Sequence, residues 1–142
     1  MADEQWISFT MGSETYVHPI HQIKEIIPYR LSVPVPGSPR CIEGILNVRG
    51  NVITVLSGCL IFEPNEPKSP TNKRIIIIDL GADQIGVSVD SVGDIISFEL
   101  DDAEWGSQKS QRQIIKGTLQ LSGKLYILTD FLNYAQASDE NK

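Results

Sequence analysis

Hydrophobic and polar residues alternate along much of the chain in short runs, a pattern that is typical of half-buried β-strands. In residues 6–11, the apolar Ile7, Phe9 and Met11 fall on one face and hydroxyl residues fall on the other. The glycine-containing stretch 12–14 has turn chemistry, and the apolar residues that follow it begin a return strand. The chain is therefore predicted to open with a β-hairpin.

The same alternation continues along the rest of the chain. It predicts further strands at residues 24–29, 44–48, 52–56, 74–80, 84–89, 93–98, 115–121 and 125–128. Three prolines within residues 33–39 require an extended loop, and three more within 63–72 indicate a linker. The polar stretch 101–113 is predicted to be a loop with room for one helical turn, and Asp130 suits the N-cap of a closing helix. The fold is therefore predicted to be all-β with a few short helices.

The two halves of the chain repeat each other. When Gly12 is aligned with Gly81, apolar positions coincide through the following hairpin, and further on Gly44 coincides with Gly117. The offset grows from 69 to 73 residues, which corresponds to a short insertion in the loops between. A generic likeness between hairpins is the alternative explanation. The repeat favours two similar small barrels, each marginally stable alone, which are expected to share a core.

One position of the repeat differs in a way that suggests a binding function. Arg49 aligns with Ser122, so a shared fold does not require the arginine. It stands beside Gly50 at the predicted tip of a turn, where a guanidinium group can reach a partner. The alternative is that Arg49 is one more solvated arginine.

Composition and charge exclude several classes of protein. The net charge is −6, which disfavours binding to nucleic acid or to an anionic membrane surface. The longest apolar run, 75–78, is far shorter than the ~20 residues of a membrane span, and residues 1–5 lack the features of a secretory signal. Cys41 and Cys59 form no CxxC motif and are predicted to be thiols in a reducing cytoplasm, with a disulfide as the alternative.

A search for catalytic or cofactor chemistry finds little. No glycine-rich phosphate loop is present, and the two histidines, His18 and His21, lie three apart on a strand-like segment, which turns them to opposite faces. We expect both histidines to be partly exposed near a strand end. The carboxylates within 101–104 are expected to be solvated rather than paired in a pocket. The sequence therefore favours a binding module with no cofactor over an enzyme.

The stretch from Gly44 to Gly50 reads Gly-Ile-Leu-Asn-Val-Arg-Gly. It matches the Gly-x-x-Asn-x-Arg-Gly motif of the CheW family, the coupling proteins of bacterial chemotaxis, which the sequence resembles. The family's opening strand and turn resemble residues 9–12, its acidic strand resembles 23–26, and its Val-Asp pair resembles 89–90. The Asn-x-Arg-Gly match is specific, whereas the hairpin alone would be weak. The resemblance extends over nearly the whole chain, and a CheW-like domain is expected at 5–138.

The resemblance implies two SH3-like five-stranded β-barrel subdomains packed about a shared core. Subdomain one is expected at about 6–62 and subdomain two at about 74–135, with a linker at 63–73 between them and a frayed tail at 139–142. It also implies a cytoplasmic scaffold with no catalysis of its own. Such a protein bridges the tip of a methyl-accepting chemotaxis receptor to the regulatory domain of the CheA histidine kinase, and controls kinase activity within a signalling array.

The resemblance also implies which residues bind partners. Candidates for the receptor side are Ile23, Val33, Val35, Gly44 and Arg49. Gly44 would permit close approach of a backbone, and Arg49 would supply charge-assisted hydrogen bonds. The two valines lie on the proline-stiffened loop and would offer apolar contacts at little ordering cost. Glu25 and Ile26 match a motif near partner surfaces, with the partner left unassigned.

The sequence departs from the family pattern after the Arg-Gly pair. Where the family has Pro-Val-x-Asp-Leu, this chain has residues 54–58, in which Ser57 can still cap a helix and Gly58 would weaken its first turn. The pathway therefore stays open between flagellar chemotaxis and type IV pilus or another chemosensory system. A self-associating structural module is a further alternative. So is an enzyme with a pocket lined by His18, Cys59 and a carboxylate.

Overall fold

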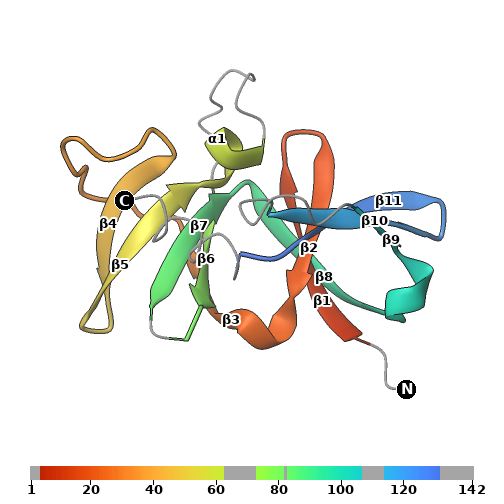
Figure 1. The fold of residues 1–142 in the computed structure, drawn as a ribbon. Coiled ribbons are helices and arrows are strands. Elements are labelled where there is room, and N and C mark those ends of the chain that lie inside the picture. The colour runs from red at the N-terminus through yellow and green to blue at the C-terminus, as the bar shows by residue number, and fades with distance from the viewer. Residues whose placement is uncertain (1–3, 63–72, 82, 107–113, 132–142) are drawn as a thin grey trace. The chain divides into compact units, whose positions relative to one another are not determined.

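The computed structural model describes residues 4–62, 73–81, 83–106 and 114–131 (Figure 1). In these residues the chain is mostly β, as predicted. The strands are β1 (Glu4–Met11), β2 (Glu14–Pro19), β3 (Ile23–Pro28), β4 (Ile42–Val48), β5 (Asn51–Ser57), β6 (Arg74–Asp79), β7 (Gln84–Val89), β8 (Ser91–Phe98), β9 (Glu104–Trp105), β10 (Ile115–Leu121) and β11 (Lys124–Thr129). The helical segments are α1 (Gly58–Phe62) and two 3-10 turns, Ile20–Gln22 and Leu100–Asp102.

Each strand predicted from the alternation is present, with ends that differ by one or two residues. The two-residue strand β9 was not predicted, because it is too short to show a period. Helix α1 begins after Ser57, whose Oγ accepts a hydrogen bond from the Leu60 N–H at 3.2 Å, so the predicted cap is confirmed. The closing helix after Asp130, the tail and nearly all of the linker lie outside the described residues.

The strands form two sheets with matching order. One is β8-β1-β2-β11-β10-β9 and the other is β3-β6-β7-β5-β4. Each sheet takes two strands from one half of the chain and the others from the other half: β1 and β2 lie with four strands of the second half, and β6 and β7 lie with three strands of the first half. In Figure 1 the red β1 and β2 accordingly share a sheet with the blue β10 and β11. The two halves meet in a parallel pair in each sheet, β2 with β11 and β5 with β7.

The backbone contacts divide the chain into two compact units. Unit 1 joins Met1–His21 to Gly93–Lys142, and unit 2 is Gln22–Val92. The subdomains expected at 6–62 and 74–135 follow the repeat, whereas the observed units cross it. The physical reason is that β3 pairs with β6 and β8 pairs with β1, so the third strand of each half joins the other half. The sheets are consistent with two SH3-like units.

Each unit has its own apolar cluster, built from inward-facing strand positions. Unit 2 buries Leu46, Val48, Ile53, Val55, Ile75 and Ile77. Unit 1 buries Trp6, Val17, Phe98, Leu119 and Leu128. Each such side chain contributes about 1.5–3 kcal/mol when fully removed from water, so these clusters are the main source of stability. Among the described residues no helix is long and apolar enough to span a membrane.

A buried polar contact lies at the parallel pair of unit 1. The Thr129 hydroxyl donates to the Val17 carbonyl oxygen at 2.8 Å, and His18 Nδ1 lies 3.2 Å from Thr129 Oγ1. Because the hydroxyl has only one hydrogen and gives it to Val17, the Nδ1–H of His18 must donate to Thr129. His18 is 1% exposed, so the prediction that it would be partly exposed is wrong. His21 is exposed, as predicted.

We predict that Thr129→Val lowers the free energy of unfolding by about 1–3 kcal/mol, because it leaves the His18 N–H and the Val17 carbonyl without this partner. Urea denaturation measures the change. Thr118→Val, at a half-buried threonine of β10, is the control and should have little effect. Equal stabilities of Thr129→Val and the unsubstituted protein would show that the hydroxyl does not hold this pair of strands together.

Candidate functional site

The turn between β4 and β5 has an unusual backbone. Val48 pairs with Asn51, which leaves a two-residue loop, and φ is +53° at Arg49 and +86° at Gly50. Positive φ at both positions is the geometry of a type I′ turn, in which a non-glycine residue costs about 1–2 kcal/mol. The equivalent turn between β10 and β11 has φ of +52° at Ser122 and +79° at Gly123. Both halves of the chain therefore share the backbone conformation of this turn, and that conformation does not require an arginine side chain.

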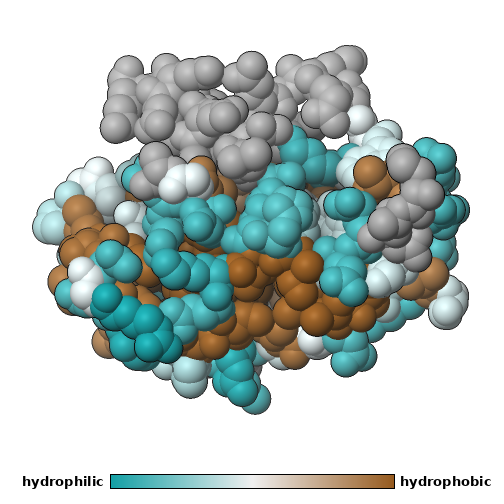
Figure 2. Space-filling model, turned by 90° about the horizontal axis from the view of Figure 1, so that it is seen from below, coloured by the Kyte–Doolittle hydropathy of each residue, from teal (hydrophilic) through white to brown (hydrophobic). Residues whose placement is uncertain are grey.

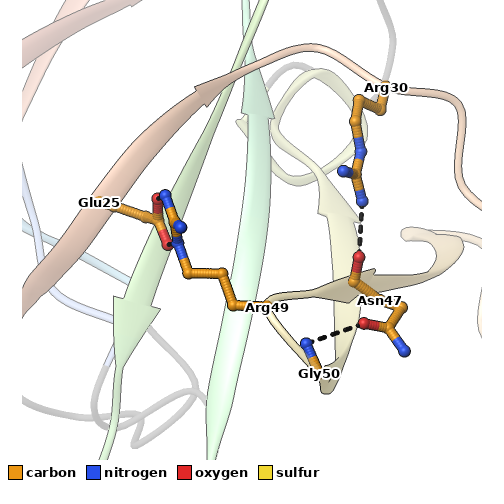
Figure 3. Close-up of polar contacts among 5 residues, drawn as sticks. All are labelled: Glu25, Arg30, Asn47, Arg49 and Gly50. Carbon is orange, nitrogen blue, oxygen red and sulfur yellow. Dashed lines mark hydrogen bonds and ion pairs between the residues drawn. The ribbon is translucent and has the colours of Figure 1, made fainter.

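The guanidinium group of Arg49 binds Glu25 through two hydrogen bonds. Nε donates to Oε2 at 2.9 Å and Nη2 donates to Oε1 at 3.1 Å (Figure 3). The Arg49 side chain is 75% exposed, whereas that of Glu25 is 22% exposed. The hydrogen bond from Arg49 lowers the pKa of the Glu25 carboxyl below its ordinary 4.5, and the same bond raises the pKa of Arg49. The carboxylate therefore gives the exposed cation a preferred direction.

Contacts between side chains join the two edges of the unit 2 sheet. Strands β3 and β4 lie at opposite ends of the strand order, yet Glu25 of β3 binds the turn that follows β4. Tyr29, just after β3, donates its hydroxyl to Glu43 Oε1 of β4 at 3.0 Å. Burial raises the pKa of this phenol, and the Glu43 carboxylate raises it further. The sheet therefore curves until its edges approach each other, as in a barrel.

A third contact of this kind supports the turn itself. Arg30 Nη2 donates to the main-chain oxygen of Asn47 at 2.7 Å. The side chain of Asn47 in turn accepts a hydrogen bond at Oδ1 from the Gly50 N–H at 3.0 Å. Figure 3 shows Arg30 and Arg49 directed to different sides of this hairpin. Arg30 was not predicted as a site residue, because nothing in the local sequence marks it.

Gly44 makes room for another part of its own chain. A Cβ atom at this position would lie 2.3 Å from the carbonyl oxygen of Val33, whose backbone exchanges two hydrogen bonds with Ile45, both of 2.9 Å. The equivalent Gly117 makes room in the same way for Glu104 O, at 2.2 Å from its Cβ position. The close approach that the resemblance implied at Gly44 is thus occupied by Val33. A direct receptor contact by Gly44 stays a prediction.

The remaining candidates are apolar and belong to unit 2. Ile23 and Ile26 are half-buried on β3. Val33 is 63% exposed and Val35 is 39% exposed. Leu31, at 85%, and Val52, at 69%, are more exposed than either, and the sequence analysis missed both. Extending the alternation of Val33 and Val35 backwards by two residues would have found Leu31. In the view of Figure 2, hydrophobic side chains are exposed among hydrophilic ones.

Metal ligands and thiols are the residues considered for chemistry that can be followed in the described parts of the chain. No group of three His, Cys, Asp or Glu side chains there could hold a metal ion. Cys41 and Cys59 are free thiols, half-buried and buried respectively. The site is therefore an exposed turn with a directed guanidinium group and neighbouring apolar side chains, an arrangement suited to binding.

Comparison with known proteins identifies a matching family and a similar solved structure. A family model described as CheW-like domain matches residues 5–138. The chemotaxis protein CheW of Klebsiella aerogenes is 27% identical over 95 residues, a match that spans 67% of this chain and 57% of that protein. Protein PilI of Pseudomonas aeruginosa is 24% identical over 102 residues, 70% of this chain and 57% of PilI. The crystal structure of the scaffolding protein TtCheW from Thermoanaerobacter tengcongensis superimposes with a TM-score of 0.78 at 26% identity, covering 93% of this chain and 92% of TtCheW.

We predict that Arg49→Ser raises the pKa of Glu25 towards 4.5 without disturbing the turn, since Ser122 occupies the same conformation. Because the folded-state pKa of Glu25 is lowered, the contribution of the pair to stability is present above the unfolded pKa and is lost as the pH falls through the folded value. A pH titration of side-chain carboxyl carbons by NMR measures the midpoint. Arg40→Ser, at another exposed arginine, should leave it unchanged.

We also predict that Gly44→Ala separates Val33 from Ile45, because the added methyl group meets the Val33 carbonyl. Hydrogen exchange of both amides should quicken by about tenfold or more. Gly106→Ala is the control, since its Cβ would make an ordinary contact of 3.6 Å with Lys116 O. Unchanged exchange at Val33 would mean that the loop accommodates a side chain at residue 44.

Proposed function

Because the chain belongs to the CheW-like family, we propose that it is a non-catalytic adaptor that couples methyl-accepting chemotaxis receptors to a CheA-type histidine kinase within a signalling array. The solved relative TtCheW is described as a scaffolding protein, which supports a connecting role. In this role the protein acts in the cytoplasm and is held at the membrane only through its partners. It changes kinase activity by placing kinase and receptor together.

The observation that carries the proposal is the exposed, directed guanidinium group of Arg49. The equivalent turn folds with a serine, so the side chain is available for a function other than folding. A guanidinium group has five N–H donors, of which two bind Glu25. The other donors can bind carbonyl or carboxylate oxygens of a partner without breaking the ion pair. A helical receptor tip presents such oxygens beside an apolar stripe.

The proposed receptor surface consists of Ile23, Val33, Val35 and Arg49. Gly44 contributes to it indirectly, because it allows Val33 to lie against β4. Glu25 orients Arg49 and therefore belongs to the same surface. Ile26 adds a half-buried apolar side chain on the same strand as Ile23. The kinase regulatory domain is proposed to bind elsewhere on the protein.

A second pathway is supported by the similarity to PilI, whose match covers 70% of this chain. The departure at residues 54–58 from the usual family pattern also favours a specialised relative. In that case the same adaptor would serve a type IV pilus system rather than flagellar chemotaxis. A self-associating module without kinase coupling is the remaining alternative, and it predicts oligomers that exclude both receptor and kinase.

We predict that Arg49→Ser weakens binding to a receptor fragment by about tenfold while the protein stays folded. Co-sedimentation with membrane-anchored receptor fragments and CheA measures incorporation into arrays, and circular dichroism checks the fold. Arg40→Ser has the same change of charge outside the proposed surface and should assemble normally. If Arg49→Ser enters arrays as well as the unsubstituted protein does, Arg49 is not a receptor contact.

A further inference from the structure

We propose that Arg30 is a positioning residue for Arg49: by holding the main chain of Asn47 it fixes the turn from which Arg49 reaches outward. The expected effect of Arg30 on receptor affinity rests on the proposed function, whereas its effect on the conformation of the turn does not. Arg30 belongs to neither the family motif nor the receptor surface described above. Its role follows from a sequence of contacts within unit 2.

The contacts run from Arg30 to Glu25 through the hairpin. Arg30 Nη2 donates to the Asn47 carbonyl at 2.7 Å, a short charge-assisted bond. Asn47 Oδ1 accepts the Gly50 N–H at 3.0 Å, which closes the loop across Arg49. Arg49 then makes its paired hydrogen bonds with Glu25 (Figure 3). Both carbonyl and side chain of Asn47 are therefore engaged, one on each side of the turn.

The second half of the chain provides an internal comparison. The turn at Ser122 has the same positive φ as Arg49 and the same glycine after it. The repeat aligns Asn47 with Gln120 and Arg30 with Glu99, which has no side-chain donor. Within the described residues, no side-chain hydrogen bond joins residues 120–123 to another element. The backbone conformation can therefore form without such support, so the support at Asn47 is not a requirement of the fold.

Hydrogen bonds that hold the backbone of this turn help to keep the charged side chain of Arg49 pointing in one direction. Arginine in a left-handed conformation is less favourable than glycine, so contacts that hold the turn favour this conformation over others. Each departure would carry the guanidinium group away from Glu25. The exposed ion pair alone is a weak restraint, because exposed pairs contribute little. The two hydrogen bonds at Asn47 restrict the backbone instead, and a pre-organised arginine pays a smaller entropic cost when a partner binds.

The test uses Arg30→Met, which keeps a long apolar stem and removes the donors, and Arg30→Lys, which restores one donor group. The first readout is the pKa of Glu25, which needs no partner. The charged groups that lower the pKa of this carboxyl are Arg49 and Lys24, so a change on substitution of Arg30 reports the position of Arg49. We expect the pKa to rise towards 4.5 in Arg30→Met and to return in Arg30→Lys. Arg74→Met is the control, since Arg74 also donates to a main-chain carbonyl, that of Lys73.

The second readout is affinity for the receptor fragment in a double-mutant cycle. We expect Arg30→Met to weaken binding about three- to tenfold on its own and to have no further effect in the Arg49→Ser background. A loss of the same size in both backgrounds, with the pKa of Glu25 unchanged, would mean that Arg30 touches the partner directly and would overturn the positioning role. An unchanged pKa together with unchanged affinity would also overturn it. If the pKa moves as expected but the unsubstituted protein binds no receptor fragment, the positioning role stands and the proposed function fails.

Discussion

The closure of the unit 2 sheet by side chains is the constraint on which the site depends. No backbone ladder joins β3 to β4; beside the single backbone pair of Val33 with Ile45, the two edges are joined through the side chains of Glu25, Tyr29 and Arg30. Each of these contacts places a polar group of one edge against the other edge. The exposed turn is thereby held to the strand that begins the unit. Binding geometry and barrel closure thus use the same few hydrogen bonds.

The internal repeat separates what the fold needs from what a partner needs. Gly44 and Gly117 are both glycine because each meets a crossing backbone, so their identity is explained by folding. Arg49 and Ser122 share a backbone conformation and differ in side chain, so the arginine calls for another explanation. Comparing the two copies within one chain thus separates residues required for folding from residues available for binding, and it needs no homologous sequence. The same comparison makes Val33, rather than Gly44, the better candidate for a contact with a partner, because Gly44 is needed to accommodate the Val33 backbone.

The strands and the turn could be predicted from the sequence, because a period of two residues fixes which side chains face the core. The partner of each strand could not, since that period is the same whichever copy of the repeat supplies the neighbour. For this reason the expected subdomains followed the repeat. The pairing of Glu25 with Arg49 was missed for a similar reason: the two residues are far apart in the sequence, and only barrel closure brings them together. The burial of His18 likewise depends on a strand from the far end of the chain.

The exchange of strands between the halves also affects the order in which the protein can fold during synthesis. Unit 2 is one continuous stretch, so all of its strands are synthesised before the strands that complete unit 1. The hairpin of β1 and β2 is made before unit 2, yet its neighbours β8 and β11 are translated after it. Its apolar face therefore lacks both neighbouring strands until these have been synthesised. Slower translation of the residues that follow Val92 would lengthen that exposure and the need for chaperones.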